Sequence, residues 1–203
     1  MARATTKETP EPDTRTLLLE AAERSLQRVG YSRLSTRQVA DEAGMPLSQI
    51  HYHFGSKDAL VVALLDHQNR RLLNRQETMF AADLPLWKRW ETACDYLDED
   101  LASGYVRILQ EMIAFGWSNP EIALAVRSSL TGWYVLLTRV ASEAAERFGT
   151  LGGLDPEDIA VLVGNAFMGG EAMLLLGFEA EGMPIRRALR RFGVLIRKAE
   201  ESN

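Results

Sequence analysis

Apolar residues recur at helical spacing along almost the whole chain, whereas alternating strand patterns and short hairpin turns are nearly absent. In the first such segment the apolar residues fall three or four positions apart, which places them on one side of a helix: Leu18, Ala21, Ala22, Leu26 and Val29. Asp13 or Thr14 can cap the start of this helix, and Gly30 can end it. The sequence therefore predicts an all-α protein.

Glycine and proline residues divide the rest of the chain into further helical segments, with breaks at Pro46, Gly55, Pro85 and Gly104 among others. The spacing between these breaks predicts helices at residues 35–43, 47–53, 56–79, 85–102, 104–117, 119–148, 156–178 and 184–200.

Composition excludes several classes of protein. Hydrophobic residues make up 46% of the chain and charged residues 25%, as in ordinary soluble globular proteins. The single cysteine, Cys94, excludes an internal disulfide framework and fits a reducing cytoplasm. Residues 1–75 carry 11 Lys and Arg against 9 Asp and Glu, whereas residues 76–203 carry 12 against 19. This uneven charge favours contact with a polyanion through the N-terminal part alone.

The segment 159–178 is apolar and long enough to span a bilayer. Asn165 and Glu171 lie inside it, and a central carboxylate costs about 2.5–3.5 kcal/mol in a membrane even on the mildest scale. Both flanks are acidic rather than basic. We therefore expect no membrane contact and interpret the segment as a helix that is buried on both sides, at a subunit interface.

The run from Ser35 to Leu60 carries the most specific local pattern. Ser35 and Gln38 have the spacing of a capping box, Gly44 can end the helix in the left-handed conformation, and Pro46 suits a first helical position. The second helix is expected to pack inward through two apolar residues, Ile50 and Phe54. Two short helices joined by a tight glycine turn form a helix-turn-helix.

Side chains suited to base edges and phosphates occupy the expected outward face of the second helix: Leu47, Ser48, Gln49, His51, Tyr52 and His53. Metal binding is not expected, because histidines two positions apart on a helix point in different directions. Ser56 can cap the next helix. Lys57 lies in its first turn, where a cation opposes the helix dipole unless an anion such as a phosphate binds there.

Residues from about Thr14 to Leu65 resemble the N-terminal domain of the TetR-type bacterial transcriptional repressors, chiefly through the runs LSTRQVADEAGM and HYHFGSK. The resemblance implies that Thr36 and Arg37 touch the DNA backbone or groove edge. It also implies that the six outward residues enter the major groove and that Lys57 holds a phosphate. Pro46 and Leu47 depart from the usual pattern, so the base preference does not carry over from relatives.

The resemblance also implies a domain organisation and a set of partners. Residues 1–12 are expected to form a mobile tail, 13–60 the DNA-binding domain, and 61–203 a helical ligand-sensing and dimerisation domain. The implied protein is a cytoplasmic homodimer that binds a palindromic double-stranded operator and is released from it by a small hydrophobic effector. No cofactor, metal or catalytic residue is expected, since the chain has no phosphate loop, HExxH motif or nucleophile elbow.

Large apolar residues in the C-terminal part form either ordinary core or the lining of an effector pocket. The pocket candidates are Trp87, Trp90, Glu111, Met112, Phe115, Trp117, Trp133, Phe167, Met168 and Glu171. An unpaired carboxylate in an apolar helical stretch is costly. Glu111 and Glu171 are therefore expected either to meet an arginine or to recognise a polar or cationic group of the ligand.

Small residues mark a candidate dimer interface in the segment 156–178, with 184–200 beside it. Ala160 and Gly164 form a stripe that permits close helix crossing, and Met168 continues it. A helix kink at Gly169 and Gly170 is the competing explanation for the glycines.

Three other interpretations stay open. Near the C-terminus a basic helix face either pairs with acidic residues or forms a second nucleic-acid site: Arg186, Arg187, Arg190 and Arg191. The protein could instead be a helical carrier of small molecules with a vestigial helix-turn-helix. It could also be a helical enzyme that uses Glu111 or Glu171 as an acid or base.

Overall fold

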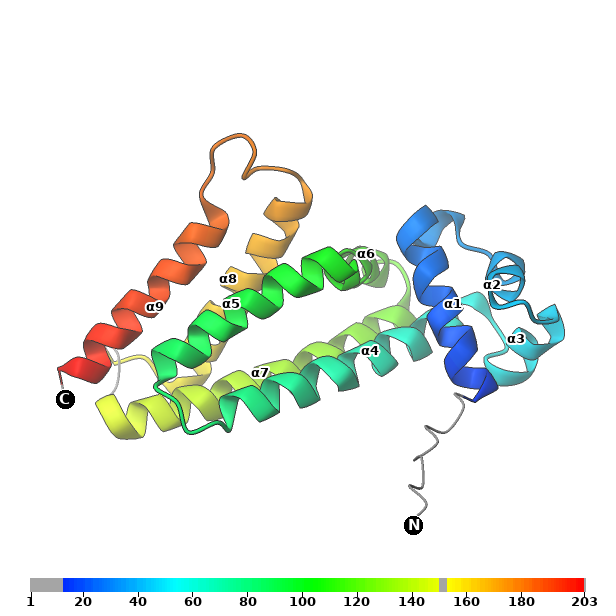
Figure 1. Ribbon diagram of the computed structural model, residues 1–203. Coiled ribbons are helices and arrows are strands. Elements are labelled where there is room, and N and C mark those ends of the chain that lie inside the picture. The colour runs from blue at the N-terminus through cyan, green and yellow to red at the C-terminus, as the bar shows by residue number, and fades with distance from the viewer. Residues whose placement is uncertain (1–12, 150–152, 203) are drawn as a thin grey trace, which may run out of the picture. The chain divides into compact units, whose positions relative to one another are not determined.

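The computed structural model describes residues 13–149 and 153–202, and within them the chain forms nine α-helices, one short 3₁₀ helix and no strand (Figure 1). The all-α prediction is confirmed. The expected mobile tail, residues 1–12, lies outside the described residues. The chain divides into two compact units, one ending at Leu64 and the other beginning at Leu65. Each is described by itself.

The first unit is a small bundle of short helices. It comprises α1 (Thr14–Val29), the 3₁₀ helix η1 (Tyr31–Arg33), α2 (Thr36–Ala43), α3 (Leu47–His53) and the first two turns of α4 (Lys57–Phe80). Helix α2 packs against both α1 and α3. Its core consists of side chains that are no more than 7% exposed: Leu18, Leu19, Ala21, Ala22, Leu26, Tyr31, Leu34, Val39, Ala40, Ile50, Leu60, Val61 and Leu64.

The helix ends in this unit follow from local chemistry. The carboxylate of Asp13 accepts a hydrogen bond from the Thr16 N–H at 2.7 Å and so caps α1. The Ser35 hydroxyl accepts from the Gln38 N–H at 3.2 Å, and the Gln38 side chain accepts from the Ser35 N–H at 2.9 Å. This completes the predicted capping box. Gly44 turns the chain with a φ of 66°, in the left-handed region.

Two local predictions were wrong in detail. Pro46 is the cap residue of α3, with extended backbone, and Leu47 is the first helical residue. Phe54 is only partly buried, because it follows the last turn of α3 and does not belong to its inward face. The Arg15 guanidinium lies 5.4 Å from the centre of the Phe54 ring.

The second unit contains the rest of α4 and five further helices: α5 (Leu86–Ser103), α6 (Tyr105–Gly116), α7 (Pro120–Phe148), α8 (Pro156–Leu175) and α9 (Ile185–Glu201). Helix α7 packs against α6 and α8, while α5 packs against α6 and α9. Helix α8 ends three residues before the predicted position 178. Gly177 adopts a φ of +81° there and the chain enters a series of turns.

Helix α8 is long and apolar enough to cross a membrane by length and composition, the one described helix that passes this test. Ala160, Gly164 and Phe167 on one side of it are buried inside the unit. Val161 and Leu162 on another side are about half exposed, at 49% and 58%. The nearly continuous apolar pattern therefore reflects one face packed in the unit and a second face that this single chain leaves uncovered.

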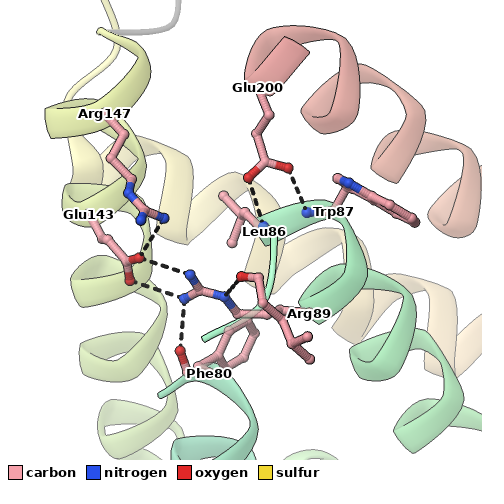
Figure 2. Close-up of polar contacts among 8 residues, drawn as sticks. Phe80, Leu86, Trp87, Arg89, Glu143, Arg147 and Glu200 are labelled. Atoms are coloured by element: carbon pink, nitrogen blue, oxygen red, sulfur yellow. Dashed lines mark hydrogen bonds and ion pairs between the residues drawn. The ribbon is translucent and has the colours of Figure 1, made fainter. Parts of the chain in front are cut away.

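A buried arginine joins three helices of this unit (Figure 2). Arg89 of α5 is only 4% exposed. Its guanidinium donates to the carbonyl oxygens of Phe80 and Leu84, both at 2.8 Å, and to both carboxylate oxygens of Glu143 at 2.9 and 3.1 Å. Arg89 thus holds the C-terminal end of α4 and its following turn against α5 and α7.

Helix α9 is fixed to α5 by acidic and basic groups. The Glu200 carboxylate accepts from the N–H groups of Leu86 and Trp87 at 2.8 and 3.1 Å, which caps the start of α5 (Figure 2). Farther along, Arg186 and Arg190 both pair with Asp98. These pairs favour the structural interpretation of the basic C-terminal face over a second nucleic-acid site.

Candidate nucleic-acid interface and ligand cavity

Helix α3 presents a narrow polar face to solvent, and Ile50 sets the rotation of the helix. Ile50 is fully buried in the first unit. The residues on the opposite side are exposed: Leu47, Ser48, His51 and Tyr52. Gln49 and His53, at the two edges of this face, are both partly buried. Four of the six predicted residues are thus exposed, whereas Gln49 and His53 lie nearer the packed side of the helix that Ile50 marks.

Tyr52 is the most exposed large side chain on this face, at 82%. Its ring meets the His53 ring edge-on at 4.9 Å. On α2, Arg37 is exposed and Thr36 is partly buried at the first helical position. The exposed side chains of α2 and α3 are short, polar, aromatic or basic, as base edges and phosphates require.

Lys57 is held inside the first unit. Its ammonium group donates to the carbonyl oxygen of Tyr31 at 2.7 Å and lies 4.2 Å from the centre of the Tyr31 ring. The Tyr31 hydroxyl in turn donates to Asp58. These contacts join η1 to the start of α4. The ammonium has two further N–H groups, so a phosphate contact by Lys57 stays a prediction.

The second unit contains a cavity between its helices that opens to solvent. The lining comes from five helices, α4 to α8: Asn69, Leu72, Gln76, Phe80, Trp90, Ala93, Leu97, Asp100, Tyr105, Leu109, Ser129, Leu130, Trp133, Leu137, Val163, Phe167, Met168 and Glu171.

Half of the predicted pocket residues line this cavity: Trp90, Trp133, Phe167, Met168 and Glu171. The other five do not: Trp87, Glu111, Met112, Phe115 and Trp117. Met112 is fully buried core, whereas Trp117 is 84% exposed. Glu111 pairs with Arg107 one turn earlier at 3.1 Å. These corrections have one cause: the sequence shows that a residue is apolar or acidic but not which side of its helix faces the cavity.

Polar lining residues from α4, α5, α6 and α7 were not anticipated: Asn69, Gln76, Asp100, Tyr105 and Ser129. A polar residue at an inward helical position was the available signal. Gln76 is an example of such a residue. Its side-chain oxygen accepts a hydrogen bond from the Trp133 indole N–H at 2.9 Å. The Trp90 indole N–H likewise donates to the Leu189 carbonyl at 2.8 Å. With both N–H groups engaged, the two tryptophans offer the cavity only ring carbons.

Glu171 is a largely buried carboxylate of the lining. Its partner is Gln110 of α6, whose side-chain N–H₂ donates to Glu171 at 3.1 Å and to the Met168 carbonyl at 3.2 Å. Burial raises the pKa of Glu171 to about 7, and the nearby Asp100 acts in the same direction. Among the described residues no arginine or lysine pairs with it. The alternative in which Glu171 meets an arginine is therefore wrong.

The residues predicted for the dimer interface lie inside the second unit. Ala160 is 2% exposed, and Met168 lines the cavity. A Cβ atom on Gly164 would lie 2.4 Å from Cε1 of Tyr134 on α7. The close crossing that this glycine permits is thus between α8 and α7 of one chain. Ala160 and Gly164 are therefore engaged within one chain, and a dimer contact through Met168, which is partly buried, stays a prediction.

Known proteins match the first unit most specifically, and their similarity also reaches into the second unit. Residues 18–64 match the family described as bacterial regulatory proteins, tetR family. The regulator TtgR of Pseudomonas putida is 29% identical over 167 residues, which cover 79% of each chain. Residues 18–64 form a TetR-family domain. TtgR is described as an HTH-type transcriptional regulator, and its similarity to this chain extends past the helix-turn-helix into the second unit.

Solved structures of the TetR fold agree with both units. A TetR transcription regulator from Haloarcula marismortui has a TM-score of 0.75 and 19% identity, covering 91% of this chain and 96% of its own. FadR from Bacillus subtilis, in complex with stearoyl-CoA, has a TM-score of 0.71 and 15% identity, covering 89% and 96%. At these identities the likeness establishes the fold alone.

Proposed function

We propose that this TetR-family chain is a cytoplasmic repressor that binds operator DNA through α3 and leaves it when an effector fills the cavity of the second unit. The observation that carries the DNA-binding part is the face of α3. The buried Ile50 anchors the helix, while the side chains on its other side stand exposed: Leu47, Ser48, His51 and Tyr52. Beside them, Thr36, Arg37 and Lys57 contact the DNA backbone. Gln49 and His53 contact the DNA at the edges of the α3 face.

Tyr52→Ala should weaken binding to the cognate operator by about 1–3 kcal/mol per half-site, with little change for random DNA. The operator is first selected from genomic fragments with the purified protein, and affinities are then measured by competition. The matched control is Trp117→Ala, because this aromatic side chain is equally exposed, at 84%, but lies in the second unit. Equal losses on cognate and random DNA would show that Tyr52 does not read the operator.

Lys57→Ala should weaken cognate and random DNA alike and reduce the salt slope by about one phosphate contact per subunit. It should also lower the stability of the first unit by about 1–2 kcal/mol, since the ammonium holds Tyr31. Thermal unfolding measured beside DNA binding separates the two effects. A stability loss with an unchanged salt slope would leave Lys57 a purely structural residue.

We further propose that the uncovered face of α8 and α9 joins two copies of the chain. Large apolar side chains on these two helices, and Leu176 directly after α8, are 36–69% exposed: Val161, Leu162, Leu175, Leu176, Phe192, Val194 and Leu195. Helices α8 and α9 are in contact, so these residues lie on neighbouring elements (Figure 1). A second copy related by a two-fold axis would cover them and place two α3 helices on two halves of a palindromic operator.

Leu162→Glu should weaken this dimer at least about tenfold, because it would bury an unpaired carboxylate in an apolar interface. The control is Leu124→Glu on α7, since Leu162 and Leu124 are similarly exposed, at 58% and 63%. Sedimentation velocity across micromolar concentrations measures both variants. A monomeric wild-type protein, or equal behaviour of the two variants, would contradict the proposed interface.

The cavity supports the effector part of the proposal. Its lining is mainly aromatic and aliphatic, with a few polar groups, as in most small-molecule sites. FadR, which shares the fold, is described in complex with stearoyl-CoA. A bound effector would select one arrangement of the dimer, in which the two α3 helices no longer fit successive major grooves.

Two other functions are distinguished by direct tests. A carrier protein with a vestigial helix-turn-helix would show no salt-sensitive DNA affinity. An enzyme that used Glu171 as an acid or base would lose turnover in Glu171→Gln while staying folded. The relatives are named as transcriptional regulators, which favours the repressor.

A further inference from the structure

The charged groups of the cavity lining are two carboxylates, Asp100 on α5 and Glu171 on α8. No lysine, arginine or histidine belongs to the lining that the structure describes. Asp100 is neutralised from α4, where the Arg75 guanidinium donates to it at 2.7 Å and also pairs with Glu99. Glu171 has only the neutral Gln110 as its partner among the described residues. The cavity therefore contains one carboxylate without a counter-charge.

Aromatic rings surround the same space. Trp90, Trp133 and Phe167 all line the cavity, and the Phe167 ring lies 5.4 Å from that of Trp90 and 6.3 Å from that of Trp133. The two indole N–H groups already donate to protein oxygens. Rings of this kind attract organic cations through their electron-rich faces and offer little to an anion.

We propose that the effector of this cavity is an organic cation with an apolar or aromatic body, whose positive charge is met by the Glu171 carboxylate. The inference rests on the proposed function, because it takes this cavity as the effector site. Gln110 is the positioning residue. Its side-chain N–H₂ bonds both Glu171 and the Met168 carbonyl, so the carboxylate is held in one orientation against α8.

The probe is benzyltrimethylammonium, compared with its neutral isostere neopentylbenzene. A quaternary ammonium keeps its charge at every pH, so any pH dependence of its binding comes from the protein. The groups that face Glu171 are Asp100 with its partner Arg75, Tyr105 and Gln110. Burial raises the pKa of Asp100 as well, but the Arg75 guanidinium opposes that rise. Burial also raises the pKa of Tyr105 above its ordinary value of 10.0, which keeps its hydroxyl neutral throughout. Glu171 is then the group that titrates near neutrality.

Binding is measured calorimetrically on the full chain without DNA. The cation should bind at least about tenfold more tightly than the neutral isostere at about pH 8. Its affinity should fall about tenfold between about pH 8 and pH 6, as Glu171 takes up a proton. Glu171→Gln should abolish both the preference and the pH dependence. Gln can still accept from Gln110, so the fold is kept.

The matched control is Glu111→Gln, which removes a carboxylate outside the lining and should leave both properties unchanged. Equal binding of the two compounds, no binding of the cation, or a preference that survives Glu171→Gln would each overturn the inference. Release of operator DNA is scored separately. Glu171-dependent cation binding that leaves DNA bound would support the cation site and count against the proposed effector function.

Discussion

Arg89→Ala is expected to lower the free energy of unfolding of the second unit by about 3–5 kcal/mol. The change leaves the carbonyl oxygens of Phe80 and Leu84 without their donor and removes a bidentate pair with Glu143. Since all four tryptophans lie between residues 87 and 133, urea unfolding followed by tryptophan fluorescence reports on this unit alone. Arg89→Lys should recover part of the loss, because an ammonium cannot reach all the acceptors of the guanidinium.

Arg147→Ala is the matched control, because Arg147 pairs with the same Glu143 from the surface, at 3.3 Å and with 53% of its side chain exposed (Figure 2). Such pairs contribute about 0.5 kcal/mol or less. Comparable losses for the two variants would mean that Arg89 acts only as one half of an ion pair. A much larger loss for Arg89→Ala would show that it acts by closing the end of α4 against α5 and α7.

The boundaries of the helices were predictable from the sequence because the signals that set them are local. Ser35 with Gln38, Gly44, and Asn119 before Pro120 each satisfy or terminate backbone groups within a few residues. The end of α8 was predicted three residues late. Residues 176 and 178 continue the apolar pattern, so periodicity alone did not reveal the turn that follows the helix.

The faces of the helices were less predictable, because they depend on partners far away in the sequence. Gly164 indicated a close helix crossing correctly, but the crossing partner is Tyr134 of the same chain. The sequence pattern alone does not say whether a small-residue stripe meets another helix of its own chain or a second copy.

The two acidic residues of apolar stretches, Glu111 and Glu171, looked equivalent in the sequence. Arg107, one turn before Glu111, makes the difference, because it supplies that carboxylate with a counter-charge. The neighbours of Glu171 on its own helix that line the cavity, Phe167 and Met168, are uncharged. Glu171 therefore depends on the amide of residue 110 from another helix, a contact that no local spacing could have indicated.

Glu171→Gln is expected to gain stability relative to the wild-type protein as the pH rises. The free energy of unfolding of the variant minus that of the wild type should increase by about 3 kcal/mol between about pH 4 and pH 8. Burial raises the pKa of Glu171 from its ordinary value of 4.5 to about 7 in the folded protein. Between these two values the folded state keeps a proton that the unfolded chain has released. The free energy of unfolding of the wild-type protein therefore falls as the pH rises through this window, and the variant does not share the loss.

Urea unfolding followed by tryptophan fluorescence at several pH values measures the difference, and comparing variant with wild type cancels the groups that the two proteins share. Glu143→Gln is a control of opposite sign. The hydrogen bonds from Arg89 lower the pKa of Glu143, so its contribution to stability is present above its ordinary value of 4.5 and is lost as the pH falls. Glu143→Gln should therefore become less stable, relative to the wild-type protein, as the pH rises. A stability difference for Glu171→Gln that stayed constant with pH would mean that the carboxylate is already compensated in the free protein, and the cavity would then have no unmatched charge to offer a cation.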